Sequence, residues 1–368
     1  MRPASAAERA RLNETFEALC RIPSPFGHER ACADHVAREL HAVGLAGAED
    51  EIGNVLYRIG DGDGGVLLCA HLDTVIPQAE IEPVIVEGGW ENANDGILGA
   101  DNKAAVAMLL EVARRCAREE PAQLPLELLF TVREENGLEG AKAFDRGRLR
   151  SRFGYVFDHA TPIGEIVLAS PTHYRLDAEF HGAAAHAGIR PEDGRNAIAA
   201  AAKAVAAMPL GRLDPETTAN VGQIEGGSVS TNVVAERCRV EAECRSLDHD
   251  RADALIAELV DHVHDGANAA ECDVDVMVNR SFEGYRTRPS DPAIQAAEAA
   301  LRACGYEPRH IVTGGGSDAN ALEAAGFRCV NLANGTERNH EPTERVSVLA
   351  LEGMLDVTYS LLDQAARC

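Results

Sequence analysis

Short apolar runs alternate with helix-period stretches along residues 1–170. The runs GVLLCAH, LPLELLFTVREE and FGYVFDH are almost wholly apolar until their last residues, which predicts strands buried on both faces of a sheet. Residues Arg30 to Val43 are amphipathic, and LGADNKAAVAMLLEVARRCARE is typical of a long helix after a loop. This alternation predicts an α/β domain, and we expect a mixed sheet with helices on both of its faces. The string GDGDGG at 60–65 predicts a hairpin turn.

The pattern changes after residue 171. The stretches HYRLDAEFHG and CDVDVMVNRSFEGY alternate, ANVGQIEGG and NVVAERCRVEAECRSLD are strand-like, and two stretches between them are helical: RNAIAAAAKAVAAMPL and RADALIAELVDHVHDGANAA. The order β-α-β-β-α-β is that of a ferredoxin-like unit. Helix–strand alternation resumes from about Ser290. We therefore expect a discontinuous α/β domain, 1–171 and 285–368, with an inserted α+β domain at 172–284.

Charge and cysteine content narrow the classes of function. The chain has 35 Lys and Arg against 59 Asp and Glu, a net charge of −24, which argues against nucleic acid or an anionic membrane surface as a partner. The first twenty residues lack an apolar signal region, and no run reaches transmembrane length. The ten cysteines form no CxxC motif and fall mostly in apolar or helical stretches. We expect reduced core thiols and a cytoplasmic location.

Acidic residues and histidines gather at or near the ends of the probable buried strands. They are His71 and Asp73 in CAHLDTV, Asp101 in LGADNKA just before a helix, Glu134 and Glu135 in TVREENG, Asp158 in YVFDHA, and His340 in the loop ERNHEP. Two histidines and several carboxylates suit Zn²⁺ or a similar divalent ion. Because the set exceeds what one tetrahedral ion requires, it suggests a two-metal hydrolase.

Each of these residues also has an ordinary explanation. Asp73 and His71 lie two apart on an extended segment, so the pair is either a buried histidine capped by an acid or a ligand oriented by one. Asp101 is either a helix N-cap or a carboxylate able to bridge two ions about 3.5–4 Å apart. Glu134 and Glu135 are either a solvated strand edge or a general base beside a ligand.

The order His/Asp, Asp, Glu-Glu, Asp, His resembles the di-zinc exopeptidase and amidohydrolase family that includes peptidase T, carboxypeptidase G, acetylornithine deacetylase and aminoacylase. The resemblance covers nearly the whole chain and is closest to peptidase T-like proteins. It implies that residues 1–171 and 285–368 form a catalytic domain and 172–284 a dimerisation domain. It also implies specific roles: His71 and Asp158 bind one zinc, Glu135 and His340 the other, Asp101 bridges both, Glu134 is the general base and Asp73 orients His71.

Further segments fit the same family. The peptide after Asp101 is cis in its members, and many have a second Asp where this chain has Asn102. His186 in GAAAHAG would reach the active site of the neighbouring subunit, although a histidine in such a turn is also an ordinary structural residue. Asn232 and Arg245 match positions that hold the carbonyl or carboxylate of the substrate. In GGGSDAN, Gly315 and Gly316 would offer backbone N–H groups to the substrate.

The resemblance implies a zinc-dependent exopeptidase that hydrolyses short peptides, in the manner of a tripeptidase-like aminopeptidase, with metal-activated water and Glu134 as base. An Asp at the position of Asp158 is typical of the aminopeptidases of the family, and a Glu of its carboxypeptidases and deacylases. An N-acyl amino acid amidohydrolase is an alternative, and a non-catalytic binding protein is a more distant one. We expect two Zn²⁺ ions per chain, with Co²⁺ or Mn²⁺ as substitutes, and a homodimer.

Overall fold

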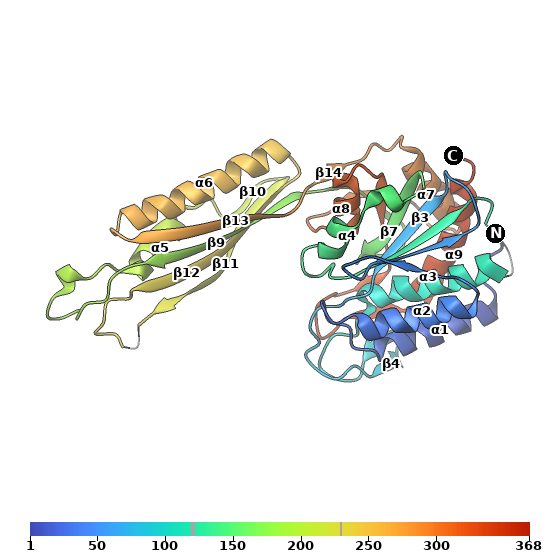
Figure 1. Cartoon of the computed structure of the whole chain (residues 1–368), viewed down its shortest axis with the longest axis horizontal. Helices are drawn as coiled ribbons and strands as arrows, with labels where there is room; N and C mark the ends of the chain where they lie inside the picture. Colours follow the sequence, from blue (N-terminus) through green and yellow to red (C-terminus); the bar gives the residue numbers. More distant parts are fainter. Residues whose placement is uncertain (119–121, 229) are drawn as a thin grey trace. The chain divides into compact units, whose positions relative to one another are not determined.

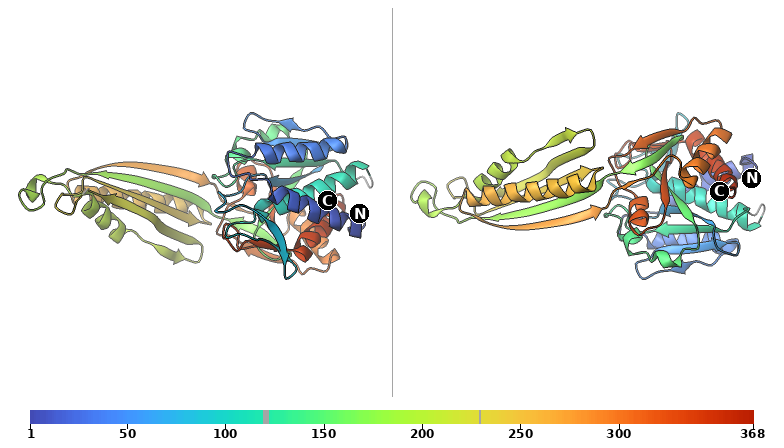
Figure 2. Two further views of the ribbon diagram at one scale, coloured as in Figure 1. Left: turned by 90° about the horizontal axis from the view of Figure 1, so that it is seen from below. Right: turned by 90° about the horizontal axis from the view of Figure 1, so that it is seen from above.

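A computed structural model of the chain describes residues 1–118, 122–228 and 230–368. The chain divides into two compact units (Figure 1). The first unit comprises Met1–Ala169 and Arg286–Cys368, and the inserted unit comprises Ser170–Tyr285. Two further views show the elements of each unit (Figure 2).

The first unit is built on a nine-stranded sheet. Its order is β1-β2-β6-β3-β7-β16-β8-β14, and β15 pairs with β8. The bounds are β1 (Ala48–Glu49), β2 (Val55–Ile59), β3 (Val66–His71), β6 (Leu126–Thr131), β7 (Phe153–His159), β8 (Glu165–Ser170), β14 (Tyr285–Arg286), β15 (Arg309–Val312) and β16 (Cys329–Ala333). A smaller sheet has the order β17-β18-β5-β4, with β4 (Pro83–Val86), β5 (Gly89–Asn92), β17 (Thr336–Glu337) and β18 (Arg345–Ser347).

The large sheet is mixed, as predicted. Strand β3 is parallel to β6 and β7, β16 is parallel to β7, and β2 is antiparallel to β6. Every residue of β3 and β6 is buried, because helices cover both faces of these central strands. The hairpin predicted at 60–65 is wrong. Strand β6 lies between β2 and β3, so this loop connects two strands that are not paired with each other.

The helices of the first unit form two groups. In the larger group, α3 packs against α1, α2 and α9, and α9 also packs against α7. In the smaller group, α4 packs against α8. Their bounds are α1 (Ala6–Cys20), α2 (Arg30–Ala42), α3 (Ala100–Arg118), α4 (Glu139–Ala143), α7 (Pro292–Ala303), α8 (Asp318–Ala324) and α9 (Val348–Ala365), with a short 3₁₀ turn, η1 (Arg146–Arg148). Leu12 and Phe16 of α1 and Leu68 of β3 belong to one continuous core.

The inserted unit is a five-stranded antiparallel sheet with two helices on one face (Figures 1 and 2). Its order is β10-β11-β12-β9-β13. The bounds are β9 (Thr172–His181), η2 (Pro191–Asp193), α5 (Ala197–Ala207), β10 (Gly211–Asp214), β11 (Thr217–Gly227), β12 (Arg237–Ser246), α6 (His249–Asn268) and β13 (Asp273–Phe282). Burial alternates along β12, because α5 and α6 cover one face of the sheet while polar side chains occupy the other.

The inserted unit contains one strand more than the predicted β-α-β-β-α-β order. This strand, β10, is four residues long and none of its residues is buried. Among the strands that the structure describes, β10 pairs with β11 alone, at the edge of the sheet. An edge strand of this kind buries no apolar face. Its sequence therefore shows neither the strand alternation of apolar and polar residues nor the helical period.

All ten cysteines are free thiols, and eight of them are buried. Cys304 is half-buried and Cys368 is exposed. Among the described residues, no helix combines the length and the apolar character needed to cross a membrane.

Candidate metal centre

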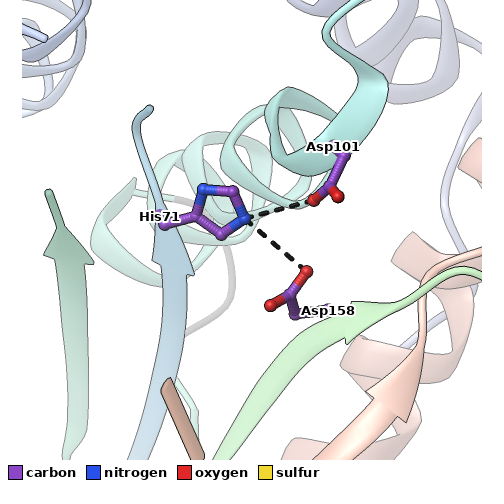
Figure 3. Close-up of side chains that lie close together, drawn as sticks. All are labelled: His71, Asp101 and Asp158. Carbon is purple, nitrogen blue, oxygen red and sulfur yellow. Dashed lines mark hydrogen bonds and ion pairs between the residues drawn. The ribbon is translucent and has the colours of Figure 1, made fainter. Parts of the chain in front are cut away.

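His71 is the last residue of the buried strand β3, and its imidazole faces two carboxylates (Figure 3). Its Nε2 atom lies 3.1 Å from Oδ1 of Asp101 and 3.6 Å from Oδ1 of Asp158. Asp158 lies near the end of the neighbouring strand β7. The other ring nitrogen, Nδ1, is 3.0 Å from the backbone carbonyl oxygen of Asp73. A hydrogen bond at Nδ1 leaves Nε2 as the nitrogen available to a metal.

A second histidine approaches the same aspartate from the other side. Nε2 of His340 lies 2.8 Å from Oε1 of Glu135 and 3.4 Å from Oδ2 of Asp101. Asp101 therefore presents one carboxylate oxygen to each histidine. Among the described residues, the Asp101 side chain accepts no hydrogen bond from the backbone of α3, but it accepts one from Nδ2 of Asn339 at 2.8 Å. This arrangement favours the bridging role of Asp101 over that of a helix N-cap.

The sequence had led us to expect Asp101 near a strand end, just before a helix. It lies instead within the irregular first turn of α3. Asp101 and Asn102 both have non-helical backbone angles, and the peptide bond between them is cis. The side-chain amide of Asn102 is buried and has no hydrogen-bond partner among the described residues. The irregular turn directs the Asp101 carboxylate toward both histidines.

The spacing of these atoms suits divalent metal ions. Two ligand atoms at about 2.0–2.1 Å from a zinc ion, at tetrahedral angles, lie about 3.3 Å apart, which is close to the separations around both histidines. Three groups of potential ligand atoms lie within 4.8 Å of one another: His71 with Asp101 and Asp158, His71 with Glu134 and Glu135, and Asp101 with Glu135 and His340. Imidazole nitrogen and carboxylate oxygen are ligand types that zinc accepts. The residues therefore fit two ions that share Asp101.

The pKa shifts of the clustered side chains also favour a site for divalent ions. Burial, together with repulsion from Asp158, raises the pKa of Glu134 well above its usual range. Burial and the Asp101 carboxylate do the same to the pKa of Asp158. Hydrogen bonds with Asp101 and Glu135 raise the pKa of His340 to about 10. So many carboxylates at close range repel one another, and positive charge supplied by divalent ions would stabilise their ionised forms.

The Asp73 side chain is fully buried, and its carboxylate bonds to backbone as well as facing His71. Oδ1 accepts the N–H of Glu134 at 3.0 Å and Oδ2 accepts the N–H of Glu135 at 2.9 Å. The distance from Asp73 Oδ1 to Nδ1 of His71 is 3.5 Å. Asp73 thus fixes the backbone of the Glu134–Glu135 pair in addition to lying beside the imidazole. The two glutamates are not a solvated strand edge, since Glu134 is buried.

The candidate substrate residues of the inserted unit lie at two separate ends of its sheet. His186 and Asn232 are exposed and lie on adjacent segments, because the N–H of Ala187 donates to the carbonyl of Asn232 at 2.8 Å. Both segments lie beyond the Arg237 end of β12. Arg245 is near the opposite end of this strand, and eight residue steps at about 3.3 Å place it about 26 Å from Arg237. The inserted unit therefore brings His186 and Asn232 together but separates both from Arg245.

Arg245 makes a two-point contact on the polar face of the sheet. Its Nε and Nη2 atoms lie 3.1 and 3.0 Å from the two carboxylate oxygens of Glu243. Oε2 of Glu243 is also 3.0 Å from Nε2 of His173. The hydrogen bond with His173 and the Arg245 contact, acting against burial, lower the pKa of Glu243 to about 2.

The glycine-rich segment lies in the first unit, between β15 and α8. The N–H of Gly315 donates to Oγ1 of Thr313 at 3.0 Å, so this donor has a partner inside its own loop. Gly316 follows directly and precedes Ser317, the N-cap of α8.

Sequence reasoning missed three residues beside the centre. Asn339 contacts Asp101, and the buried Glu344 contacts the backbone before α3. Asp318 is buried and accepts a hydrogen bond from Oγ1 of Thr131 at 2.5 Å, and burial raises its pKa to about 6. All three lie in GGGSDAN or directly around His340, segments that the sequence had already marked, but no periodicity distinguishes them from solvated polar residues.

Two family models match the chain. The model of the M20 peptidase dimerisation domain matches residues 172–271, and the model of peptidase family M28 matches residues 54–182. The second match spans six residues of the candidate centre: His71, Asp73, Asp101, Glu134, Glu135 and Asp158.

Three relatives match almost end to end. The aminopeptidase PepT of Bacillus cereus is 34% identical, with 97% of this chain and 99% of that chain covered and a TM-score of 0.87. A tripeptidase of Staphylococcus aureus is 31% identical, with 98% and 99% covered and a TM-score of 0.92. The uncharacterized protein YqjE of Bacillus subtilis is 33% identical over 97% of this chain and 99% of its own length.

Proposed function

Because the chain belongs to the M20 family of metallopeptidases, in its peptidase T-like branch, we propose that it is an aminopeptidase that hydrolyses short peptides. The observation that carries this proposal is the convergence of His71, Asp101 and His340, with Glu135 and Asp158, in one centre. The full-length likeness to proteins named as an aminopeptidase and a tripeptidase supports the substrate class. The buried free thiols suit a reducing compartment, so we place the enzyme in the cytoplasm.

Two zinc ions are the proposed cofactors, with cobalt or manganese as substitutes. His71 and Asp158 would hold one ion, Glu135 and His340 the other, and Asp101 both. Ions bound there would supply Lewis acidity and would lower the pKa of water toward neutrality.

Glu134 is the proposed general base. Its side chain is buried beside His71 and Glu135, and burial raises its pKa, which suits a group that must both accept and return a proton near neutral pH. Glu134 accepts a proton from the attacking water and donates it to the nitrogen of the departing amine. Asp73 holds the backbone N–H of Glu134 and so keeps the base in position.

The substrate contacts proposed for the inserted unit come from two copies of the chain. Arg245 would hold the carbonyl or carboxylate of the peptide from one copy. Asn232, which lies beside His186, would reach the same group from the other copy, where His186 would stabilise the developing oxyanion. Within one inserted unit, His186 and Arg245 are too far apart to contact the same small substrate. In a dimer the two contacts can come from different chains, so this separation supports a dimer. Gly315 and Gly316 would line the substrate from the first unit.

A matched set of substrates tests the assignment. The purified, zinc-loaded protein is assayed with a tripeptide, the same tripeptide N-acetylated, and an N-acetyl amino acid, each with and without chelator. We expect the free tripeptide to give the highest kcat/KM and chelator to abolish turnover. Faster hydrolysis of the N-acetyl amino acid would replace this proposal with an amidohydrolase.

A further inference from the structure

The buried carboxylate of Glu344 collects three backbone hydrogen bonds from a single segment. Oε2 accepts the N–H of Leu98 at 2.9 Å and the N–H of Gly99 at 2.8 Å, while Oε1 accepts the N–H of Asp101 at 2.9 Å. The side chain is only 2% exposed. Hydrogen bonds to an ionised acceptor are stronger than neutral ones, and removing such an acceptor leaves buried N–H groups without partners.

The segment 98–101 needs this acceptor because of its position before α3. Asp101 and Asn102 are not helical, so the preceding N–H groups have no carbonyl of an earlier helical turn to bond. Glu344 substitutes for that turn. It therefore sets the position of the backbone from which the Asp101 side chain extends.

Glu344 also belongs to the loop that carries His340. Glu344 follows His340 by four positions, and the N–H of Glu344 donates to the carbonyl of Glu341 at 2.9 Å. From the same loop, Asn339 bonds the Asp101 side chain. The loop thus contacts Asp101 at its backbone N–H and at its carboxylate, and supplies His340 beside it.

We propose that Glu344 is a positioning residue of the metal centre, which holds Asp101 in register with His340 so that one carboxylate serves both ions. This inference rests on the ligand set proposed above. Because Asp101 is shared, misplacing it weakens the binding of both ions, whereas loss of His340 alone affects mainly one. A residue that only stabilised the fold would change the unfolding temperature and leave metal affinity unchanged.

The test replaces Glu344 by its isosteric amide. In Glu344→Gln an NH₂ group faces at least one of the three N–H donors, while shape is retained. Zinc affinity is measured at 25 °C by competition with a chromophoric chelator, and unfolding is followed by circular dichroism. We expect both ions to bind about 10- to 100-fold more weakly, the range typical of residues that orient ligands, and hydrogen exchange at residues 98–101 to accelerate.

Glu341→Gln is the matched control, since Glu341 is exposed, lies in the same loop and loses the same charge. Its zinc affinity should remain at the wild-type level. If Glu344→Gln does not fold, Glu344→Asp, which keeps the charge but shortens the reach, carries the test with the same expected weakening. Wild-type affinity for both ions in a folded Glu344 variant overturns the inference. Failure of the wild-type protein to bind two ions would instead overturn the proposed centre.

Discussion

Asp73 and Glu134 are joined by a hydrogen bond of 3.0 Å from the backbone N–H of the glutamate to the aspartate carboxylate. The other oxygen of Asp73 accepts the N–H of Glu135. One buried side chain at the end of β3 therefore fixes the proposed base and an adjacent proposed ligand, both of which follow β6. Orientation of the base and of the ligand should fail together when this carboxylate is altered.

Asp73→Asn should lower kcat and weaken zinc binding without unfolding the protein. The introduced amide must oppose the N–H of either Glu134 or Glu135, so one of the two hydrogen bonds is lost. We expect losses of about 10- to 100-fold in each quantity, measured by steady-state kinetics and chelator competition. Asp63→Asn, at an exposed position of the 60–65 loop, is the control. An unchanged kcat in Asp73→Asn would show that the contact does not orient the base.

Glu134→Gln and Glu135→Gln should separate catalysis from metal binding. The first variant should keep its metal content and lose about 10²–10⁴ in kcat, because it lacks a group that can carry the proton. The second should lose an ion, because it removes a ligand placed beside His340. Elemental analysis after gel filtration, paired with kinetics on the same samples, gives both values. The reverse pattern would exchange the roles of the two residues.

Zinc binding should release protons, and affinity should rise with pH. Facing carboxylates raise the pKa of His340 to about 10, so at neutral pH its imidazole is protonated in the metal-free protein. Burial raises the pKa values of the proposed ligands Asp158 and Glu135 as well. Ligands must lose these protons to bind metal, so each rise in pH below these pKa values favours binding. Calorimetric titrations in buffers of different ionisation enthalpy measure the release, and proton uptake would contradict the assignment.

His186→Ala and Glu134→Ala proteins should restore each other's activity when their subunits exchange. In a random mixture half of the dimers are mixed, and each mixed dimer has one complete site of two, so recovery reaches about a quarter of wild-type activity. A mixture of His186→Ala with the doubly substituted protein is the control and should recover nothing. Absence of recovery despite exchange shown by mass spectrometry would confine His186 to its own chain.

The sequence located the strands that carry the centre because they are buried on both faces. Strands β3, β6 and β7 are apolar runs that end in His71, in the residues before Glu134, and near Asp158. Parallel strands deliver such ends to one edge of a sheet, so the cluster follows from the order of the chain.

Other features of the fold and of the site depend on contacts between distant segments, which produce no hydrophobic periodicity in the sequence. Neither the pairing of β2 with β6 nor the exposed edge strand β10 could be derived from local pattern. In the sequence, Glu344 resembles any acidic residue of a polar loop. Only the fold shows that the N–H groups of Leu98 and Gly99 donate to its carboxylate. The same holds for Asp73, whose bonds to the Glu134–Glu135 backbone span two strands.

The inserted unit leaves and rejoins the chain at neighbouring points. His173 and Phe282 are paired across β9 and β13, and in the first unit the N–H of Thr287 bonds the carbonyl of Leu168 at 2.7 Å. Excision of residues 172–284 would thus leave two chain ends that a linker of about two to four residues, the length of a hairpin loop, can close. Both core clusters are composed within their own units, so the shortened protein should keep its own core and offer a scaffold on which metal loading can be studied apart from peptide turnover.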